Sequence, residues 1–316
     1  MKTKIVYALV SSPSDFYLEQ ALISVHSLRM YNPNAVVELV VDAITDMNLM
    51  EKRAKIREYV DEVHVVETPE GYNPVQRSRY LKTNLRKYVK GDYLFVDCDT
   101  IICDSLSDID NIEADMAMVA DLNGNLALSD VAILARCDKA GFQQMKGQPY
   151  FNSGVVYSKD TWQSNKLYDR WYENWCQSDS HGVKYDQPAL CAANVESGKI
   201  IQELDGIWNC QFKMQGYPYL KKAKIMHYYS NNGENDAFYT LPMDMLFQEV
   251  RDNGITPLVE QLICHAKTDL YAVMTVNKGQ FMSFFNSHML YVYTNRPTLY
   301  KILERIGKVL ENIMYR

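Results

Sequence analysis

Residues 93–99, YLFVDCD, join an apolar tetrapeptide to two carboxylates. A short apolar run bounded by polar residues is typical of a β-strand buried in a sheet. In a sheet of parallel strands, ligands bind beyond the carboxyl ends of the strands. Asp97 and Asp99 directly follow the predicted strand, and the apolar pair 101–102 comes after them. We therefore expect the two aspartates at the ligand-binding edge of a sheet.

Strand-like and helix-like segments alternate along the chain before this stretch. Such alternation predicts an α/β fold, in which a mostly parallel sheet is covered by helices on both faces. Further along, a helix carries Leu167, Trp171 and Trp175 at intervals of four residues, which predicts a stripe that faces the core. The predicted strands are 5–10, 36–41, 63–66, 93–96, 116–119, 131–134 and 155–157, and the predicted helices before residue 99 are 18–28, 49–59 and 80–88.

The composition narrows the class of protein. The 316 residues are 47% hydrophobic, which is enough for a large core. The net charge of -6 argues against nucleic acid as a partner, because nucleic-acid binders are basic. Seven cysteines without a CxxC pair predict free thiols in a cytoplasmic protein. The apolar segment 5–10 is too short for a signal peptide, and no apolar run reaches the roughly 18 residues of a membrane-spanning helix.

Two carboxylates and an imidazole are candidate ligands of a divalent cation. The Asp97 and Asp99 carboxylates are hard oxygen ligands that suit Mn²⁺ or Mg²⁺, and such an ion in turn suits a diphosphate. The short apolar segment 224–227 ends on His227, and an imidazole ligand favours Mn²⁺ over Mg²⁺. Taken singly, an acidic triplet is common in solvated turns, and a lone histidine is more often structural.

Two further motifs add polar groups. Asn152 and Ser153 precede Gly154, which would let the backbone approach a ligand closely; the alternative is a plain turn into a strand. Asp186 and Gln187 precede a proline that fits the first turn of a helix, and the alternative for Asp186 is a helix N-cap.

These motifs, in this order, resemble glycosyltransferase family 8, which includes glycogenin and bacterial lipopolysaccharide galactosyl- and glucosyltransferases. The resemblance covers residues 4–233. It implies a GT-A fold and a retaining enzyme that moves a hexose from a UDP-sugar, with Mn²⁺ (or Mg²⁺) as cofactor. The acceptor would be a glycan, lipid-linked or protein molecule in polysaccharide biosynthesis.

The resemblance also implies roles for individual residues. By position, Asp97, Asp99 and His227 resemble the metal ligands of the family, and Asp186 and Gln187 resemble the pair beside the reactive carbon. The residues that the resemblance assigns to donor binding are Ala8, Val10, Asp15, Tyr17, Arg79, Asp97, Cys98, Asp121, Asn152, Ser153 and Gly233.

The chain departs from the family pattern in two places. The family usually continues after this histidine to a glycine and a lysine that grips the diphosphate, whereas here residues 228–236 read YYSNNGEND. The lysine is absent, so either another base replaces it or the donor is enclosed differently. The aspartates usual in the uracil loop are also imperfect here, which leaves the nucleotide base open.

Two mechanisms and two rival functions follow from these residues. Retention is expected through attack from the leaving-group face, and the rival is a double displacement with Asp186 as the nucleophile. One rival function is a protein that binds a nucleotide sugar without transferring it. The other is a phosphatase built on Asp97 and Asp99, but that motif belongs on the first strand of a chain.

The chain divides into a predicted catalytic domain, 1–240, and a predicted helical extension, 241–316, that binds the acceptor or associates with a membrane. Residues 299–316 form a basic amphipathic tail. It would either dock on its own domain or lie on the anionic inner face of the membrane. The expected location is cytoplasmic, with peripheral membrane contact as the second alternative.

Overall fold

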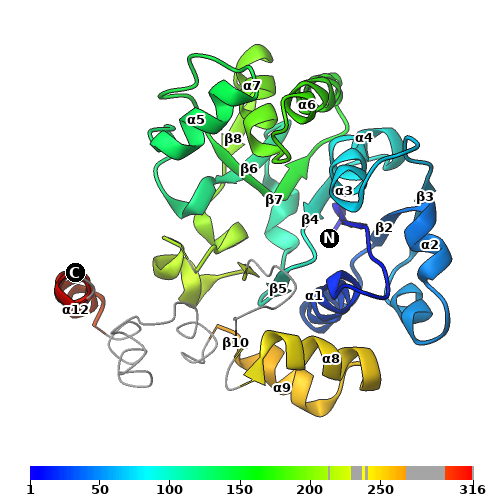
Figure 1. Cartoon of the computed structure of the whole chain (residues 1–316). Coiled ribbons are helices and arrows are strands. Elements are labelled where there is room, and N and C mark those ends of the chain that lie inside the picture. Colours follow the sequence, from blue (N-terminus) through cyan, green and yellow to red (C-terminus); the bar gives the residue numbers. More distant parts are fainter. Residues whose placement is uncertain (213, 229–236, 239–240, 268–295, 315–316) are drawn as a thin grey trace.

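The computed structural model describes residues 1–212, 214–228, 237–238, 241–267 and 296–314. At its centre lies a seven-stranded sheet with the strand order β3-β2-β1-β4-β7-β6-β8 (Figure 1). The strands are β1 (Lys4–Leu9), β2 (Val37–Asp42), β3 (Glu62–Val66), β4 (Tyr93–Val96), β6 (Met116–Ala120), β7 (Phe151–Ser158) and β8 (Ile201–Glu203).

The pairing of these strands is mostly parallel, as predicted. Every neighbouring pair is parallel except the two that contain β7, which runs antiparallel to β4 and to β6. The carboxyl ends of β1, β4 and β6 therefore meet at one edge of the sheet. Asp97 follows β4 and Asp121 follows β6 at this edge.

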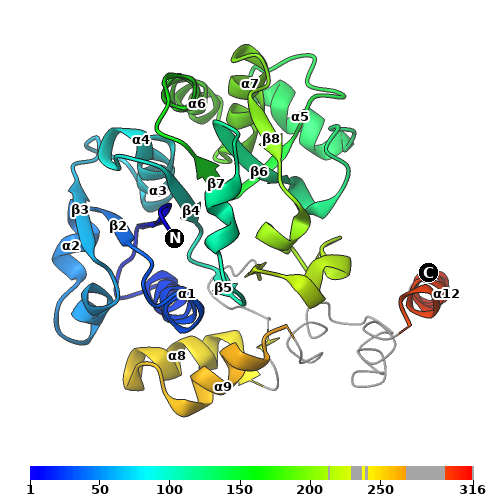
Figure 2. The ribbon, with the colours of Figure 1, turned by 180° about the vertical axis from the view of Figure 1, so that it is seen from behind.

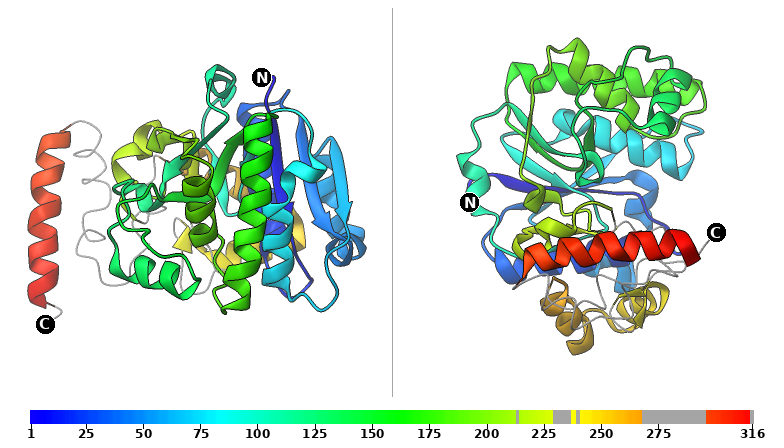
Figure 3. Two further views of the ribbon diagram at one scale, coloured as in Figure 1. Left: turned by 90° about the horizontal axis from the view of Figure 1, so that it is seen from above. Right: turned by 90° about the vertical axis from the view of Figure 1, so that its left-hand side faces the viewer.

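Helices cover both faces of the sheet, because side chains alternate between the faces along each strand. In β1, Ile5 and Tyr7 belong to one hydrophobic core and Val6 to the other. Figures 2 and 3 show the helices on the two sides of the sheet. One face carries α3 (Pro74–Thr83), α4 (Leu85–Tyr88), α5 (Val131–Lys139), α6 (Trp162–Ser180) and α7 (Gln187–Glu196), and the other carries α1 (Tyr17–Tyr31), α8 (Met243–Asn253) and α9 (Pro257–His265).

Three predictions made from the sequence are confirmed. Leu167, Trp171 and Trp175 of α6 are buried in the core. All seven cysteines are free. The helical stretch at 49–59 is a 3-10 helix, η1 (Glu51–Glu58), and a short helix, α2 (Ala43–Asn48), precedes it.

One predicted strand is wrong. Residues 131–134 are the first turn of helix α5, whose N-cap is Asp130 with a side chain that accepts a hydrogen bond from Ile133 N at 2.9 Å. Val131 is 81% exposed, so the apolar run is not a buried strand. In addition, Asn152, Ser153 and Gly154 lie inside β7 rather than in a turn before it.

A second, two-stranded sheet completes the site region. It consists of β5 (Thr100–Ile102) and β9 (Ile225–His227), which pair antiparallel with Thr100 opposite His227. A further pair, β10 (Ala237–Phe238) with β11 (Leu241–Pro242), follows. Because β5 follows β4 closely in the sequence, the pairing of β5 with β9 brings His227 beside the end of β4.

The C-terminal helices differ in how they meet the rest of the molecule. Leu246, Phe247 and Val250 of α8 belong to the same core as Ile5 of β1, so this core crosses the predicted boundary at residue 240. Helix α12 (Pro297–Met314) lies at the edge of the molecule (Figure 3). Among the described helices, none is both long and apolar enough to cross a membrane.

Candidate active site

Three candidate metal ligands converge at the carboxyl edge of the sheet. One ligand atom each from Asp97, Asp99 and His227 lies within 4.8 Å of the others. The backbone N–H of Asp97 donates to Gly154 O at 2.7 Å, which ties the end of β4 to β7. Because β9 pairs with β5, His227 Nε2 lies 3.1 Å from Asp99 Oδ1 although 128 residues separate them. Two carboxylates and an imidazole at this spacing fit a divalent cation such as Mn²⁺.

The imidazole of His227 is oriented by an amide. His227 Nδ1 lies 3.0 Å from Asn209 Oδ1 in the 3-10 helix η4 (Gly206–Asn209), while Asn209 Nδ2 donates to Asn152 Oδ1 at 2.8 Å. The second bond fixes the Asn209 amide so that its oxygen faces the histidine. Nδ1 therefore donates, and Nε2 is the nitrogen that faces Asp99 and could bind a metal ion. Nothing in the sequence singles out Asn209.

Gly154 leaves room for this arrangement. A Cβ atom at this position would lie 2.4 Å from His227 Cε1 and 2.9 Å from both Asp97 Oδ2 and Asn152 Oδ1. Carbon atoms in contact are normally about 3.5–4.0 Å apart. Only glycine therefore lets β7 run this close to two of the candidate ligands.

A group of cations lies beside the acidic residues. Lys82 Nζ lies 3.0 Å from Asp97 Oδ1 and 3.9 Å from Asp186 Oδ2, and Arg79 Nε lies 3.2 Å from Asp186 Oδ1. Both come from α3, one turn apart. Lys82 was not predicted, because a lysine on a helix is normally solvated, yet here it is almost fully buried against the ring of Phe95.

An open cavity of about 280 Å³ lies next to these groups. It is lined by six of the predicted donor-binding residues, of which Asp97 is also a predicted metal ligand, and by a second predicted metal ligand. These are Ala8, Val10, Tyr17, Arg79, Asp97 and Cys98, together with Asp99. Asp121, Asn152 and Ser153 do not line this cavity, and Asn152 Nδ2 donates to Asp121 Oδ1 at 3.0 Å.

The sequence matches the model of a known protein family over the region that carries this site. The model of glycosyl transferase family 8 matches residues 8–234, which include every candidate described so far. The chain belongs to glycosyltransferase family 8. It is a glycosyltransferase, as expected from its motifs.

Solved structures agree with the fold of this family 8 glycosyltransferase. A structure of the galactosyltransferase LgtC in complex with donor and acceptor sugar analogues aligns with 82% of this chain and 100% of that one, at 15% identity and a TM-score of 0.54. The glycosyltransferase GlyE of Streptococcus pneumoniae TIGR4 aligns with 83% of this chain but only 63% of its own, at 16% identity and a TM-score of 0.51. No curated protein matched the sequence. The GT-A fold is confirmed.

A further predicted donor residue of the family 8 glycosyltransferase, Asp15, does not line the cavity. The carboxylate of Asp15 is used within its own loop, where it accepts hydrogen bonds from Ser11 Oγ at 2.7 Å, Ser12 N at 2.8 Å and Tyr17 N at 3.1 Å. Gly233 lies outside the described residues.

Burial and neighbouring charges set the ionisation of the carboxylates. Burial raises the pKa of Asp99, but the charge and hydrogen bond of His227, a backbone hydrogen bond and Lys82 together bring the net pKa below its usual range. Burial likewise raises the pKa of Asp186, and Lys82 and Arg79 then bring it below its usual range. Both groups are therefore anionic at neutral pH, ready to bind cations.

Two other groups show the opposite shift. Burial raises the pKa of Asp121, which outweighs hydrogen bonds from Asn152 and Gln187. Burial and the adjacent carboxylates raise the pKa of the Cys98 thiol well above its usual range. Cys98 therefore remains a neutral thiol, and its Sγ donates to Ala8 O at 3.6 Å.

A further cavity residue was not predicted from the sequence. Gln20 of α1 is one helical turn from Tyr17 and lines the same cavity. Its side chain is only 1% exposed, and its Nε2 atom finds no hydrogen-bond partner among the described residues. A buried amide without a partner normally costs stability, so the Gln20 side chain is a candidate contact for a ligand of the cavity.

Proposed function

We propose that this enzyme uses a divalent cation, Mn²⁺ in preference to Mg²⁺, to transfer a hexose from a UDP-sugar to a glycan, lipid-linked or protein acceptor with retention of configuration. The observation that carries the proposal is the convergence of Asp97, Asp99 and His227 beside the cavity. The oriented Nε2 of His227 adds a nitrogen ligand, which separates this site from an all-oxygen magnesium site. When bound, the ion would neutralise charge on the departing diphosphate.

The cations on α3 replace the lysine that the family keeps after its histidine. Arg79 lines the cavity and is placed to contact the diphosphate. Lys82 sits behind it, between Asp97 and Asp186, and holds both carboxylates in position. Helix α3 would therefore supply the positive charge that the family obtains from the lysine after its histidine.

The sugar would lie against a set of polar groups that are already connected. Asn152 bonds Asp121 and Asn209, and Gln187 Nε2 donates to Phe151 O at 3.3 Å. Groups fixed in this way can orient the sugar hydroxyls without reorganising during the reaction.

The surroundings of Asp186 favour attack from the leaving-group face. Its carboxylate is engaged by Arg79 and Lys82 and by the Ser153 hydroxyl. A carboxylate stabilised by two cations and a hydroxyl is a weak nucleophile, because its charge is already compensated. Asp186 occupies the N-cap position of α7, but its side chain makes no capping bond, so it is free for this positioning role.

The nucleotide would occupy the part of the cavity between β1 and α1. Tyr17, 38% exposed, offers a ring for stacking, and the Gln20 amide offers a donor and an acceptor. The imide edge of uracil presents a matching N–H and carbonyl oxygen. The amide can therefore pair with the base of a UDP donor.

A panel of nucleotide sugars tests the proposal. We expect loss of a UDP-sugar in the presence of Mn²⁺, through slow hydrolysis or transfer, and little loss after chelation of the metal. Asp99→Asn should abolish turnover. Turnover that does not depend on metal would contradict the proposed site, and binding of UDP-sugar without any turnover by the wild-type enzyme would identify a pure binding protein. Most activity remaining in Asp186→Asn would eliminate the double displacement.

The segment 241–316 is proposed to contact the acceptor, and α12 to contact a membrane at its cytoplasmic face. Leu299, Ile302, Ile306 and Val309 are exposed on one side of α12, and Lys301 and Arg305 are exposed near them. Exposed apolar side chains with nearby cations suit an anionic lipid surface. Sedimentation with anionic and neutral vesicles tests this, and equal absence of binding to both would favour docking on the protein itself.

A further inference from the structure

The loop at residues 11–17, between β1 and α1, is held by an arginine from far along the chain. Arg251 of α8 donates through Nη1 to Pro13 O at 3.2 Å and through Nη2 to Asp15 O. Its guanidinium also lies over the ring of Phe16, 4.3 Å from the ring centroid. A side chain 17 residues beyond the end of the family match therefore contacts three residues of a loop that borders the cavity.

The same guanidinium is anchored by a buried carboxylate. Glu19 of α1 is 1% exposed, and it accepts from Arg251 Nε at 2.8 Å and from Arg251 Nη2 at 3.1 Å. Arg53 of η1 lies near the same carboxylate, with Nη1 3.9 Å from Glu19 Oε1, and its Nη2 donates to Ser11 Oγ at 2.9 Å. A buried carboxylate needs such partners, so Glu19 fixes where both arginines point.

The loop contacts are linked to the wall of the cavity. Asp15 accepts from Ser11, Ser12 and Tyr17, so the loop is internally bonded from its first residue to its last. Val10, which directly precedes the loop, and Tyr17, its last residue, line the cavity. Movement of the loop would therefore shift the wall against which the nucleotide lies.

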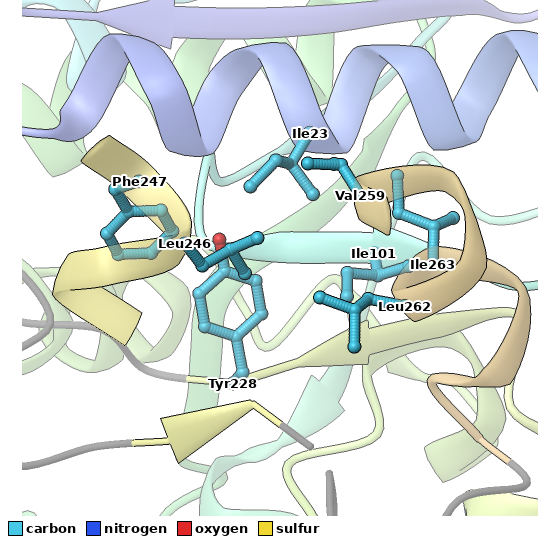
Figure 4. Close-up of a pocket in the computed structure, with 8 residues that line it drawn as sticks. All are labelled: Ile23, Ile101, Tyr228, Leu246, Phe247, Val259, Leu262 and Ile263. Carbon is cyan, nitrogen blue, oxygen red and sulfur yellow. The ribbon is translucent and has the colours of Figure 1, made fainter. Parts of the chain in front are cut away.

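Apolar packing keeps α8 in reach of the loop. A small apolar cavity lies between α1, β5, α8 and α9, with Ile23, Ile101, Phe247 and Val259 among its lining residues (Figure 4). Tyr228, which directly follows the candidate ligand His227, points into the same space. The helix pair α8–α9 is thus packed against the elements that carry both the loop and the metal ligands.

We propose that Arg251 is a positioning residue of the donor site, which holds loop 11–17 in the conformation that receives the nucleotide. The C-terminal helix α8 is then part of the donor site and not only of an acceptor module. This inference rests on the proposed function, because it takes the cavity as the nucleotide site. Its mechanism is preorganisation, in which the loop is ordered before the ligand arrives.

The test compares Arg251→Gln with wild type in three measurements. These are amide hydrogen exchange of residues 11–17 without ligand, the Kd of UDP in the presence of Mn²⁺, and KM and kcat for the UDP-sugar that the wild type consumes. We expect faster exchange in the loop. If the ordered fraction of the loop falls to about a tenth, the Kd of UDP and the donor KM rise about tenfold, while kcat stays within about twofold because ground-state binding is what is lost.

Two further variants separate positioning from general destabilisation. Glu19→Gln/Arg251→Gln leaves no buried carboxylate without its arginine, yet still breaks the contacts to Pro13 and Asp15, and should show the same rise in Kd. Arg170→Gln is the matched control, because Arg170 makes two ion pairs, to Glu173 at 2.8 Å and Glu196 at 3.1 Å, at the surface of α6.

Each outcome decides the matter. Wild-type affinity for UDP in both Arg251 variants would overturn the inference. So would a fall in Tm and kcat with KM unchanged, which is the signature of a purely structural residue. If the wild-type protein binds no UDP in the presence of Mn²⁺, the proposed function itself is refuted. This failure is distinguishable from a failure of the Arg251 inference, because it is seen in the wild type and not only in the variants.

Discussion

Replacing Gly154 by alanine should damage the metal site while leaving the fold in place. The new Cβ would lie 2.4 Å from His227 Cε1 and 2.9 Å from Asp97 Oδ2. Since carbon contacts are about 3.5 Å or longer, the imidazole must move by roughly 1 Å. A displacement of about 1 Å in a reacting constellation costs about 10²-fold in rate, and disturbed ligand orientation costs about 10- to 100-fold in metal affinity.

The assay is Mn²⁺ titration of donor consumption, with thermal unfolding measured in parallel. We expect the Mn²⁺ midpoint to rise and the free energy of unfolding to fall by only about 1–3 kcal/mol, the usual cost of an extra methyl in a packed region. Gly124→Ala is the control, because its Cβ would meet chiefly the side chain of Gln215 at 3.3 Å. If Gly154→Ala keeps the wild-type Mn²⁺ midpoint and rate, the proposed geometry is wrong.

Other substitutions probe separate parts of the molecule. Asn209→Leu removes the acceptor for His227 Nδ1, so Mn²⁺ affinity should fall about 10- to 100-fold in the same titration. Lys82→Met removes a cation that competes with a metal for Asp97, so calorimetry should show tighter Mn²⁺ binding to the donor-free protein and weaker binding of UDP-sugar. The lowered pKa of Asp186 stabilises the fold above the unfolded-state value of about 3.9, and this stability is lost as the pH falls through the lower folded-state pKa; acid unfolding of Asp186→Asn should therefore be less steep than that of wild type. Trp175→Ala, in the buried stripe of α6, should lower the free energy of unfolding by about 3–5 kcal/mol in urea titration without changing the donor KM.

The parts of the fold that were predictable are those that local pattern determines. Strands β1, β2 and β4 are mainly apolar, and their repeated separation by helical segments specifies the α/β class. The run 131–134 was ambiguous, because a short apolar segment suits either a strand or one turn of a helix. Asp130, one residue before this run, is the capping signal that could have decided it.

The site was less predictable, because its contacts join distant segments. Asp97 and Asp99 follow a strand and so could be placed at the sheet edge, whereas the position of His227 beside them depends on the pairing of β5 with β9. Lys82 lies in a predicted helix, but nothing local indicates that its ammonium turns inward. Arg251 lies further still, and only the packing of α8 on α1 reveals its contact with the loop.

The β5–β9 sheet has a consequence for biosynthesis. Chains emerge from the ribosome from the N-terminus at about 5–20 residues per second, so Asp99 is exposed well before the partner strand that ends at His227 exists. A nascent chain that stops short of β9 carries both carboxylates but no imidazole. The proposed cation site is therefore completed only after residue 227 has been made, and we expect the enzyme to acquire its metal after folding rather than during synthesis.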